Sequence, residues 1–214
     1  FAGEEIPSAE VVELPVASNT MTADDYLDCK EFDLSVEIFY NDHALREVSG
    51  FLSHLGLSMF QFVATCHDLR SEFPQRLGVL YDEFRQMSSR ELATNRAIAL
   101  LTCVPEVMDV ARRGLRKLLE ESGRGTPGML RFADELIEFC LLRRDALLEG
   151  HDRVGSFSFD FLRMAEQGFA VDPNDFTLTS SQELEFFQVP EILEEMRRHH
   201  DAYPEPFNAL RNVL

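Results

Sequence analysis

The sequence predicts an all-α protein of about eight helices in a two-layer globular arrangement, with an acidic N-terminal arm. Apolar residues recur at spacings of three and four along most of the chain, as on the buried faces of helices. No stretch alternates apolar and polar residues over the length of a strand. The chain has 214 residues, 45 % of them hydrophobic, with eighteen Phe and no Trp. This composition is ample for one packed core, and no run approaches the ~20 apolar residues of a membrane span.

The acidic residues gather near the N-terminus. Residues 1–22 mix Pro, acidic and small residues with little periodicity and predict a flexible arm, whereas residues 23–214 predict a single all-α domain. Ten carboxylates and one base, Lys30, lie within residues 1–40, which therefore carry half of the net charge of −18. This acidity excludes nucleic acid as a partner and allows at most transient contact with an anionic membrane.

The start of the chain and its cysteines indicate a cytoplasmic protein. The first residues are acidic and lack the basic and apolar regions of a signal peptide. The four cysteines form no metal-binding pattern, and we expect them to be buried thiols in a reducing compartment.

Capping and breaking residues set the first helices. Thr22 can cap a helix that runs through Leu27, with two acidic residues in its first turn. Asp42 can cap a second helix, whose apolar residues recur from Leu45 to Leu55 and which Gly56 ends. An apolar stretch from 59 to 73 then leads to Pro74, where we expect a kink or a restart.

Further helices are predicted along the rest of the chain, separated by a Gly-rich loop at 122–128 and a turn at 172–175. Their ranges are Arg76–Gln86, Ser89–Cys103, Pro105–Glu121, Met129–Glu149, Phe157–Gln167, Ser181–Phe187, Ile192–His200 and Phe207–Val213.

Catalytic and metal-binding signatures are absent from the sequence. It contains no Gly-rich phosphate loop, no nucleophile elbow and no zinc-binding HExxH. Cys66, His67 and Asp68 are consecutive, and consecutive side chains on a helix point about 100° apart, so they cannot form a relay. We therefore predict no enzyme activity, no cofactor and no metal site.

A set of polar residues inside apolar helices is the candidate binding site. Its members are Asp68, Arg112, Arg113, Arg116 and His151. Arg112 and Arg116 share a helix face at i,i+4, and guanidinium groups suit phosphate. A carboxylate, guanidinium groups and an imidazole above an apolar cavity would bind the polar head of an amphiphile. The alternative is structural: Asp68 forms an ion pair with an arginine, and His151 caps a helix.

Several short segments, in this order, carry a resemblance to a known family. They are Ala44–Gly56 with its closing Leu-Gly, a Phe-rich stretch leading to Asp68, Arg112-Arg113-Gly114-Leu115, Ala146–His151, and Pro173 with Phe176. Together they resemble the glycolipid transfer protein superfamily. The resemblance implies an all-α, two-layer fold that holds the chains of a sphingolipid between its helices. It also implies that Asp68 and His151 contact the head group.

Two positions differ from the family pattern. Glu72 stands where the family has Asn or Lys, and a carboxylate there would repel a phosphate. Val110 stands where sugar-binding members have a Trp, and a valine cannot stack on a sugar ring. Either the specificity differs from that of the family, or the fold has been kept without transfer activity.

The leading hypothesis is therefore a non-enzymatic protein that binds or transfers a sphingolipid-like lipid without a sugar. The predicted head-group residues are those of the candidate binding site, and the residues predicted to line the apolar chamber are Phe51, Leu55, Phe60 and Phe62. The alternative is an acidic helical adaptor or inhibitor whose charge steers it to a basic protein partner.

Overall fold

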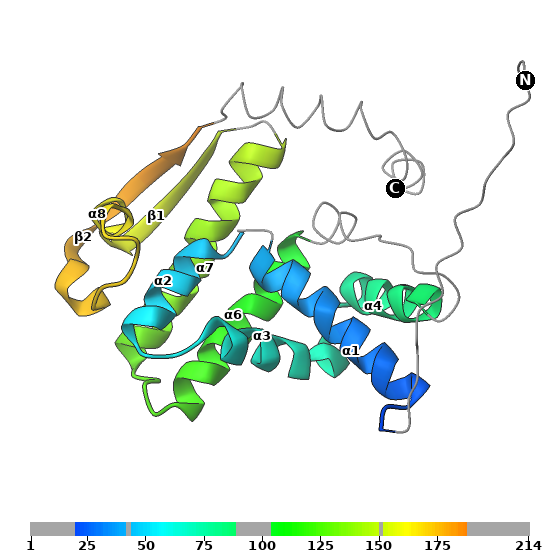
Figure 1. The fold of residues 1–214 in the computed structure, drawn as a ribbon. Coiled ribbons are helices and arrows are strands. Elements are labelled where there is room, and N and C mark those ends of the chain that lie inside the picture. The colour runs from blue at the N-terminus through cyan, green and yellow to red at the C-terminus, as the bar shows by residue number, and fades with distance from the viewer. Residues whose placement is uncertain (1–19, 42–43, 89–103, 150–151, 188–214) are drawn as a thin grey trace, which may run out of the picture.

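The structure is a computed structural model, and it describes residues 20–41, 44–88, 104–149 and 152–187. This part of the chain forms seven α-helices, three short irregular helices and one β-hairpin (Figure 1). The helices are α1 (Ala23–Val36), α2 (Arg46–His54), α3 (Met59–Asp68), α4 (Gln75–Ser88), α6 (Val104–Glu121), α7 (Pro127–Glu149) and α8 (Phe161–Glu166). The short helices are the π-helix η1 (Glu37–Asn41) and the 3₁₀ turns η2 (Arg70–Glu72) and η3 (Pro173–Phe176); the strands are β1 (Arg153–Phe159) and β2 (Thr177–Phe186).

The hairpin corrects the all-α prediction. β1 and β2 pair antiparallel, so the predicted helix Ser181–Phe187 is wrong, and the helix predicted from Phe157 begins only at Phe161. The sequence does alternate here. Phe157 and Phe159 are buried, whereas their neighbours Ser156, Ser158 and Asp160 are less buried, and Leu184 is buried between two exposed glutamates. The alternation is short and is interrupted by a register shift after Phe157, so its pattern is too brief to predict a strand.

Several predicted helix ends are confirmed. Thr22 caps α1 in a reciprocal capping box with Asp25, although the helix continues past Leu27 to Val36. Gly56, with φ +66°, follows the end of α2, and Gly123, with φ +73°, follows the end of α6. Glycine adopts this left-handed conformation without steric cost, so both positions stop a helix.

Other predictions lie outside the described residues. These are residues 1–19 of the arm, Asp42 itself, the helix Ser89–Cys103, the helices after residue 187, and His151. The prediction that Asp42 caps the second helix is wrong, because α2 begins at Arg46 with Leu45 at its N-cap position. Of the cysteines, Cys66 and Cys140 are buried as expected, but Cys29 is exposed; Cys103 lies outside the described residues.

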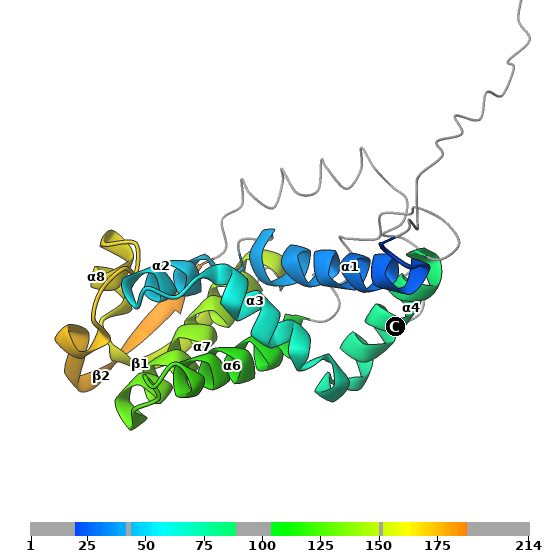
Figure 2. The same ribbon diagram turned by 60° about the horizontal axis from the view of Figure 1, so that its bottom comes forward.

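The elements pack in a continuous series. The hairpin lies against α7, α7 against α6, α6 against α3, and α3 against α1, which also contacts α4 (Figures 1 and 2). The two-layer arrangement expected for this chain stays a prediction. None of the described helices is long and apolar enough to cross a membrane.

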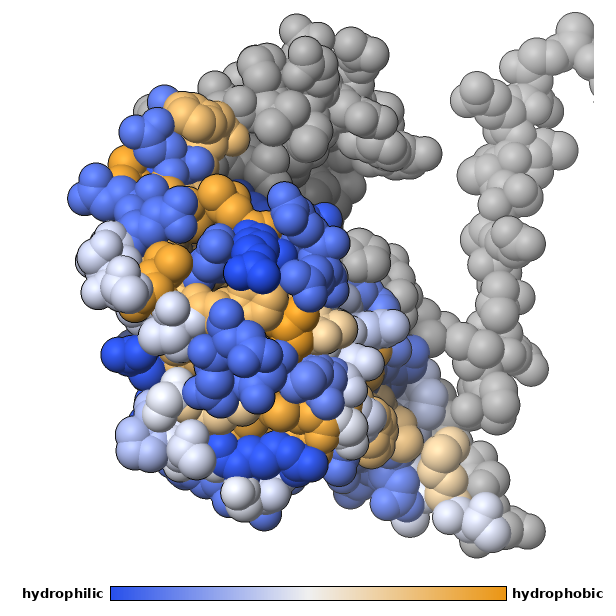
Figure 3. Space-filling model, turned by 90° about the vertical axis from the view of Figure 1, so that its left-hand side faces the viewer, coloured by the Kyte–Doolittle hydropathy of each residue, from blue (hydrophilic) through white to orange (hydrophobic). Residues whose placement is uncertain are grey.

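Phenylalanine rings hold the hairpin to α7. Phe161 of α8 lies nearly parallel to Phe139 of α7, with 5.0 Å between ring centroids, and also to Phe132, at 5.8 Å. Phe157 of β1 contacts both Phe139 and Phe161 edge to face. On the outer face of this region, hydrophobic residues are visible at several places between hydrophilic ones (Figure 3).

The close approach of α2 to the turn after α8 gives a test of the fold. A Cβ atom at Gly50 would overlap the backbone carbonyl oxygen of Gly168, whereas a Cβ at Gly78 of α4 would meet nothing within 4 Å. We expect Gly50→Ala to destabilise the protein by about 1–3 kcal/mol, because backbone must move. Gly78→Ala should stabilise it by about 0.4–1 kcal/mol. Urea denaturation of both variants measures the difference, and equal midpoints would contradict this packing.

Candidate functional site

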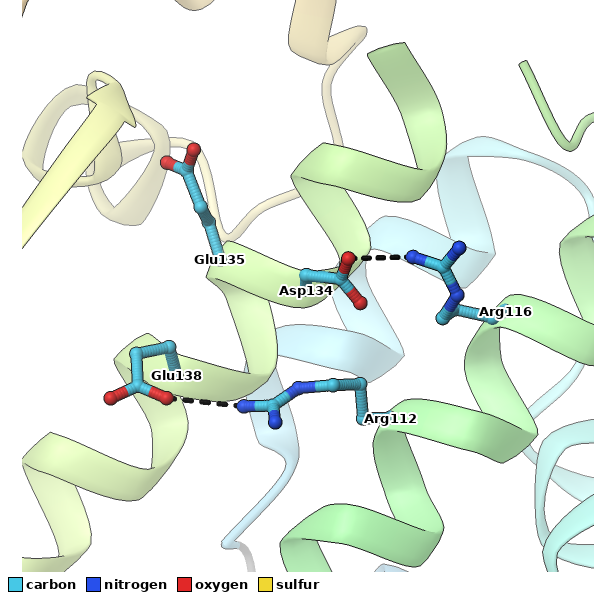
Figure 4. A pocket seen from close by; sticks show the side chains of 5 residues that line it. All are labelled: Arg112, Arg116, Asp134, Glu135 and Glu138. Atoms are coloured by element: carbon cyan, nitrogen blue, oxygen red, sulfur yellow. Dashed lines mark hydrogen bonds and ion pairs between the residues drawn. The ribbon is translucent and has the colours of Figure 1, made fainter. Parts of the chain in front are cut away.

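A groove between α6 and α7 contains two of the predicted head-group residues. It has a volume of about 530 Å³ and is lined by Arg112, Arg116, Asp134, Glu135 and Glu138. The two arginines come from α6 and the three carboxylates from α7 (Figure 4).

The antiparallel packing of the two helices creates the groove's charge pattern. A short loop at 122–126 joins α6 to α7, so the chain reverses direction there. Arg112 and Arg116 are four residues apart, and so are the two carboxylates that face them. Arg116 Nη1 donates to Asp134 Oδ2 at 2.6 Å, and Arg112 Nη2 donates to Glu138 Oε2 at 3.1 Å. The groove is thus a ladder of two ion pairs, one helical turn apart.

The spacing of the charged residues along α6 and α7 brings the ion-paired side chains to positions that face each other. Buried apolar residues alternate with the charged ones at helical spacing: Ala111 and Leu115 on α6, and Ala133 and Ile137 on α7, are fully buried. The charged residues therefore fall beside the contact line between the helices, at its solvent edge.

The two ion pairs leave polar atoms unpaired. Arg112 Nε and Asp134 Oδ1 are buried and have no hydrogen-bond partner among the described residues. The side chains of both pairs remain between 34 % and 45 % exposed. Pairs at this exposure contribute about 0–1 kcal/mol each, so exchanging one partner for a ligand costs little.

Glu135 has a different role from the other two carboxylates. It points away from the arginines toward the hairpin (Figure 4), where its carboxylate accepts hydrogen bonds from the backbone N–H and the hydroxyl of Ser158. It therefore fixes β1 to α7 at the register shift, where Ser158 lacks a regular strand partner.

The remaining predicted head-group residues lie elsewhere. Arg113, between the other two arginines in sequence, donates to the carboxylate and the carbonyl oxygen of Glu72 and pairs with Asp109. Glu72 is thus a partner of Arg113. Asp68 is exposed at the end of α3 and forms no ion pair with a described residue. Neither Arg113 nor Asp68 lines the groove, and His151 lies outside the described residues.

The residues predicted to line the apolar chamber have different environments. Phe51 and Phe62 are fully buried, and their rings pack on Phe132 and Phe39, with centroid distances of 4.8 and 6.4 Å. Leu55 is half-buried at the end of α2. Phe60 is 68 % exposed and contacts Phe32 on α1. Phe51 and Phe62 are therefore core residues, and Phe60 is a surface residue.

A buried hydroxyl network crosses the contact of α1, α3 and α4. Ser35 Oγ lies 2.8 Å from His67 Nδ1 and 2.7 Å from the Tyr81 hydroxyl. Burial, together with the charge of Arg70, lowers the pKa of His67, and burial raises that of Tyr81. A serine beside a histidine is the arrangement of a nucleophile. Ser35 is fully buried, however, so no substrate reaches it and the network is structural.

Glu47 is a charged residue inside the core. Its side chain is 2 % exposed, and it accepts from Arg46 Nε at 2.9 Å and from Arg143 Nη2 at 3.1 Å. The Cys140 thiol also donates to it at 3.5 Å, and burial raises the pKa of that thiol well above its usual value. The cluster joins α2 to α7, and its paired carboxylate indicates a structural role.

Neither a cluster of metal-ligating residues nor a similarity to known proteins points to a function for the described part of the chain. Across the described ranges, no three His, Cys, Asp or Glu side chains gather where they could hold a metal ion. Comparisons with protein-family models, curated proteins and solved structures find no match to this chain. The resemblance to the glycolipid transfer protein superfamily stays a prediction.

Sequence reasoning selected the two arginines but missed Asp134 and Glu138. The signal was available: if the chain folds back at the loop centred near Gly125, residues 112 and 116 face residues 138 and 134. Both carboxylates are therefore the expected partners of an i,i+4 arginine pair on the preceding helix.

The depressed pKa of His67 gives a test of the Ser35 network. The folded protein resists protonation of His67, so the unfolded state binds the proton first. The stability that depends on neutral His67 is present above its ordinary pKa of about 6.5 and is lost as the pH falls below that value. We expect the urea midpoint to fall more between about pH 7.5 and about pH 5.5 in the wild type than in His67→Gln. His54→Gln, at an exposed position on α2, is the control, and parallel profiles for the wild type and His67→Gln would contradict the assignment.

Proposed function

We propose that this protein is a non-enzymatic lipid-binding or lipid-transfer protein of the cytoplasm, with the polar head of its lipid in the α6–α7 groove. The observation that carries the proposal is that Arg112 and Arg116 lie side by side along one groove. There the N–H groups of both guanidinium groups could donate to a head-group oxyanion. The proposal needs no cofactor or metal. It involves at most brief contact with a membrane, because the chain carries a net charge of −18.

The lipid chains require apolar space next to the head-group site. Leu115 and Leu119 of α6 and Phe132 and Leu136 of α7 are buried core residues of the two helices that form the groove. Each buried CH₂ group contributes about 0.8 kcal/mol, so a chain of about ten carbons could supply about 8 kcal/mol toward separating these core side chains. The absence of Trp favours a lipid without a sugar, because the chain has no indole ring to stack on one.

Lipid carriage can be tested on freshly purified protein. We expect native mass spectrometry to detect bound lipid, and we expect transfer of a phosphosphingolipid between vesicles to exceed that of a glycosylated sphingolipid. The double variant Arg112→Gln/Arg116→Gln should lose most of this transfer, because it removes the two positively charged guanidinium groups of the groove. Lys117→Gln is the matched control, since Lys117 lies on the same helix and pairs with Glu121 outside the groove.

A variant of Asp68 distinguishes a head group in the groove from a head group at the site that the family resemblance implies. Because Asp68 does not line the groove, Asp68→Val should leave transfer unchanged. Loss of transfer in Asp68→Val but not in the double arginine variant would place the head group at the family's site instead. If the protein carries no lipid and transfers none, the proposal is wrong.

A second candidate function, binding of a basic protein partner, is favoured by the surface of α1. This helix exposes Asp24, Asp25 and Asp28. Arg85 of α4 forms ion pairs with three carboxylates of the helix at once. The surplus of negative charge would attract a basic segment of a partner.

Binding to α1 predicts a salt-dependent interaction with a Lys-rich peptide. We expect Asp24→Asn/Asp28→Asn to weaken binding by about threefold to tenfold at low salt, with a smaller difference at high salt. Glu166→Gln/Glu183→Gln removes two exposed carboxylates from α8 and β2 and is the control of equal charge. Equal weakening by both double variants would show a general effect of net charge and contradict a site on α1. Titration calorimetry provides the measurement.

A further inference from the structure

The groove between α6 and α7 presents matched charges of both signs. Arg112 and Arg116 supply two cations, and Glu138 and Asp134 supply two anions directly opposite them. Glu135, the remaining lining residue, keeps its negative charge but points away from the arginines toward the hairpin, where it accepts from Ser158 of β1 (Figure 4). The four side chains that face one another across the groove therefore carry equal positive and negative charge, although the whole protein is strongly acidic.

This balance disfavours a ligand with charge of only one sign. A simple anion near Arg112 would also face the carboxylates of Asp134 and Glu138, and a simple cation near those carboxylates would face both arginines. A ligand that carries both charges avoids the two repulsions, because each of its charges can lie beside the opposite charge of a ladder rung.

Two unpaired atoms support the same conclusion. Arg112 Nε is a buried donor without an acceptor, and Asp134 Oδ1 is a buried acceptor without a donor, among the described residues. A buried polar atom without a partner is unfavourable, so a rearrangement of the two ion pairs around a ligand that supplies the missing partners gains binding energy. One atom requires an acceptor and the other a donor, and both belong to residues that line the groove.

We propose that the groove binds a zwitterion, in which a phosphate group and a primary ammonium group lie a few bonds apart. The phosphate oxygens accept hydrogen bonds from Arg112 and Arg116. The ammonium group donates to Asp134 and Glu138. The inference deepens the proposed function by naming the class of head group, but it concerns the groove alone and can be tested without lipid chains.

The test uses O-phosphoethanolamine as a soluble probe, with inorganic phosphate and ethanolamine as probes of each charge alone. Titration calorimetry on the full chain should give binding of phosphoethanolamine at least about tenfold tighter than of either control, a difference equivalent to about 1.4 kcal/mol. If phosphate alone binds as tightly as phosphoethanolamine, the groove is an anion site and the inference is wrong.

Asp134→Asn gives the sharper discrimination, because the two kinds of site predict opposite signs. Removal of a carboxylate should strengthen the binding of a simple anion, but it should weaken phosphoethanolamine binding by about tenfold if the ammonium group contacts Asp134. Glu138→Gln repeats the test at the other rung, and Lys117→Gln should have no effect. Thermal melts of each variant verify that it folds. Tighter or unchanged binding of phosphoethanolamine by both carboxylate variants overturns the inference.

The lipid function and the zwitterion site can fail separately. Binding of phosphoethanolamine without any transfer from vesicles would retain the site and reject lipid carriage. Transfer of lipid without binding of phosphoethanolamine would retain the carriage and reject this class of head group.

Discussion

The packing of phenylalanine rings on α7 is the interaction on which the rest of the structure depends. Phe132 and Phe139 lie on one face of this helix and stack with Phe161 of α8. A two-stranded hairpin is only marginally stable alone, so β1 and β2 need this apolar contact to persist. Phe161, Phe132 and Phe157 are almost completely shielded from solvent. An aromatic ring without a polar atom suits such a site, because it leaves no donor or acceptor without a hydrogen bond. This accounts for the use of Phe in place of Trp in this part of the core.

The same helix links the aromatic core to the candidate site. Asp134 and Glu138 alternate along α7 with the buried residues that hold it against α6 and the hairpin. Their positions are therefore fixed by apolar packing, and the ion pairs with α6 are a consequence of that packing rather than its cause. Glu135 adds a polar restraint from α7 to Ser158, so the wall of the groove next to the hairpin is held from two sides.

Local signals in the sequence predicted the helices well and the hairpin poorly. Thr22, Gly56 and the loop after α6 act through local backbone geometry, which a sequence reveals directly. The strand residues Phe157 and Leu184 depend on partners that are distant in sequence, and their alternation is too short to stand out. For the site, the i,i+4 spacing predicted that Arg112 and Arg116 share a face. It could not predict that Arg113 turns instead to Glu72 on another element.

The acidity of the chain has a consequence for recognition. With nearly two acidic residues for each basic one, an arginine on this surface readily acquires a carboxylate partner, as Arg112, Arg113 and Arg116 all do. An anionic ligand would have to displace that carboxylate, which would then repel the negative charge of the ligand beside it. A ligand that brings its own cation avoids this cost, because the displaced carboxylate gains a new partner in the same step. In a protein of this charge, an arginine site and a preference for ligands of mixed charge therefore follow from the same composition.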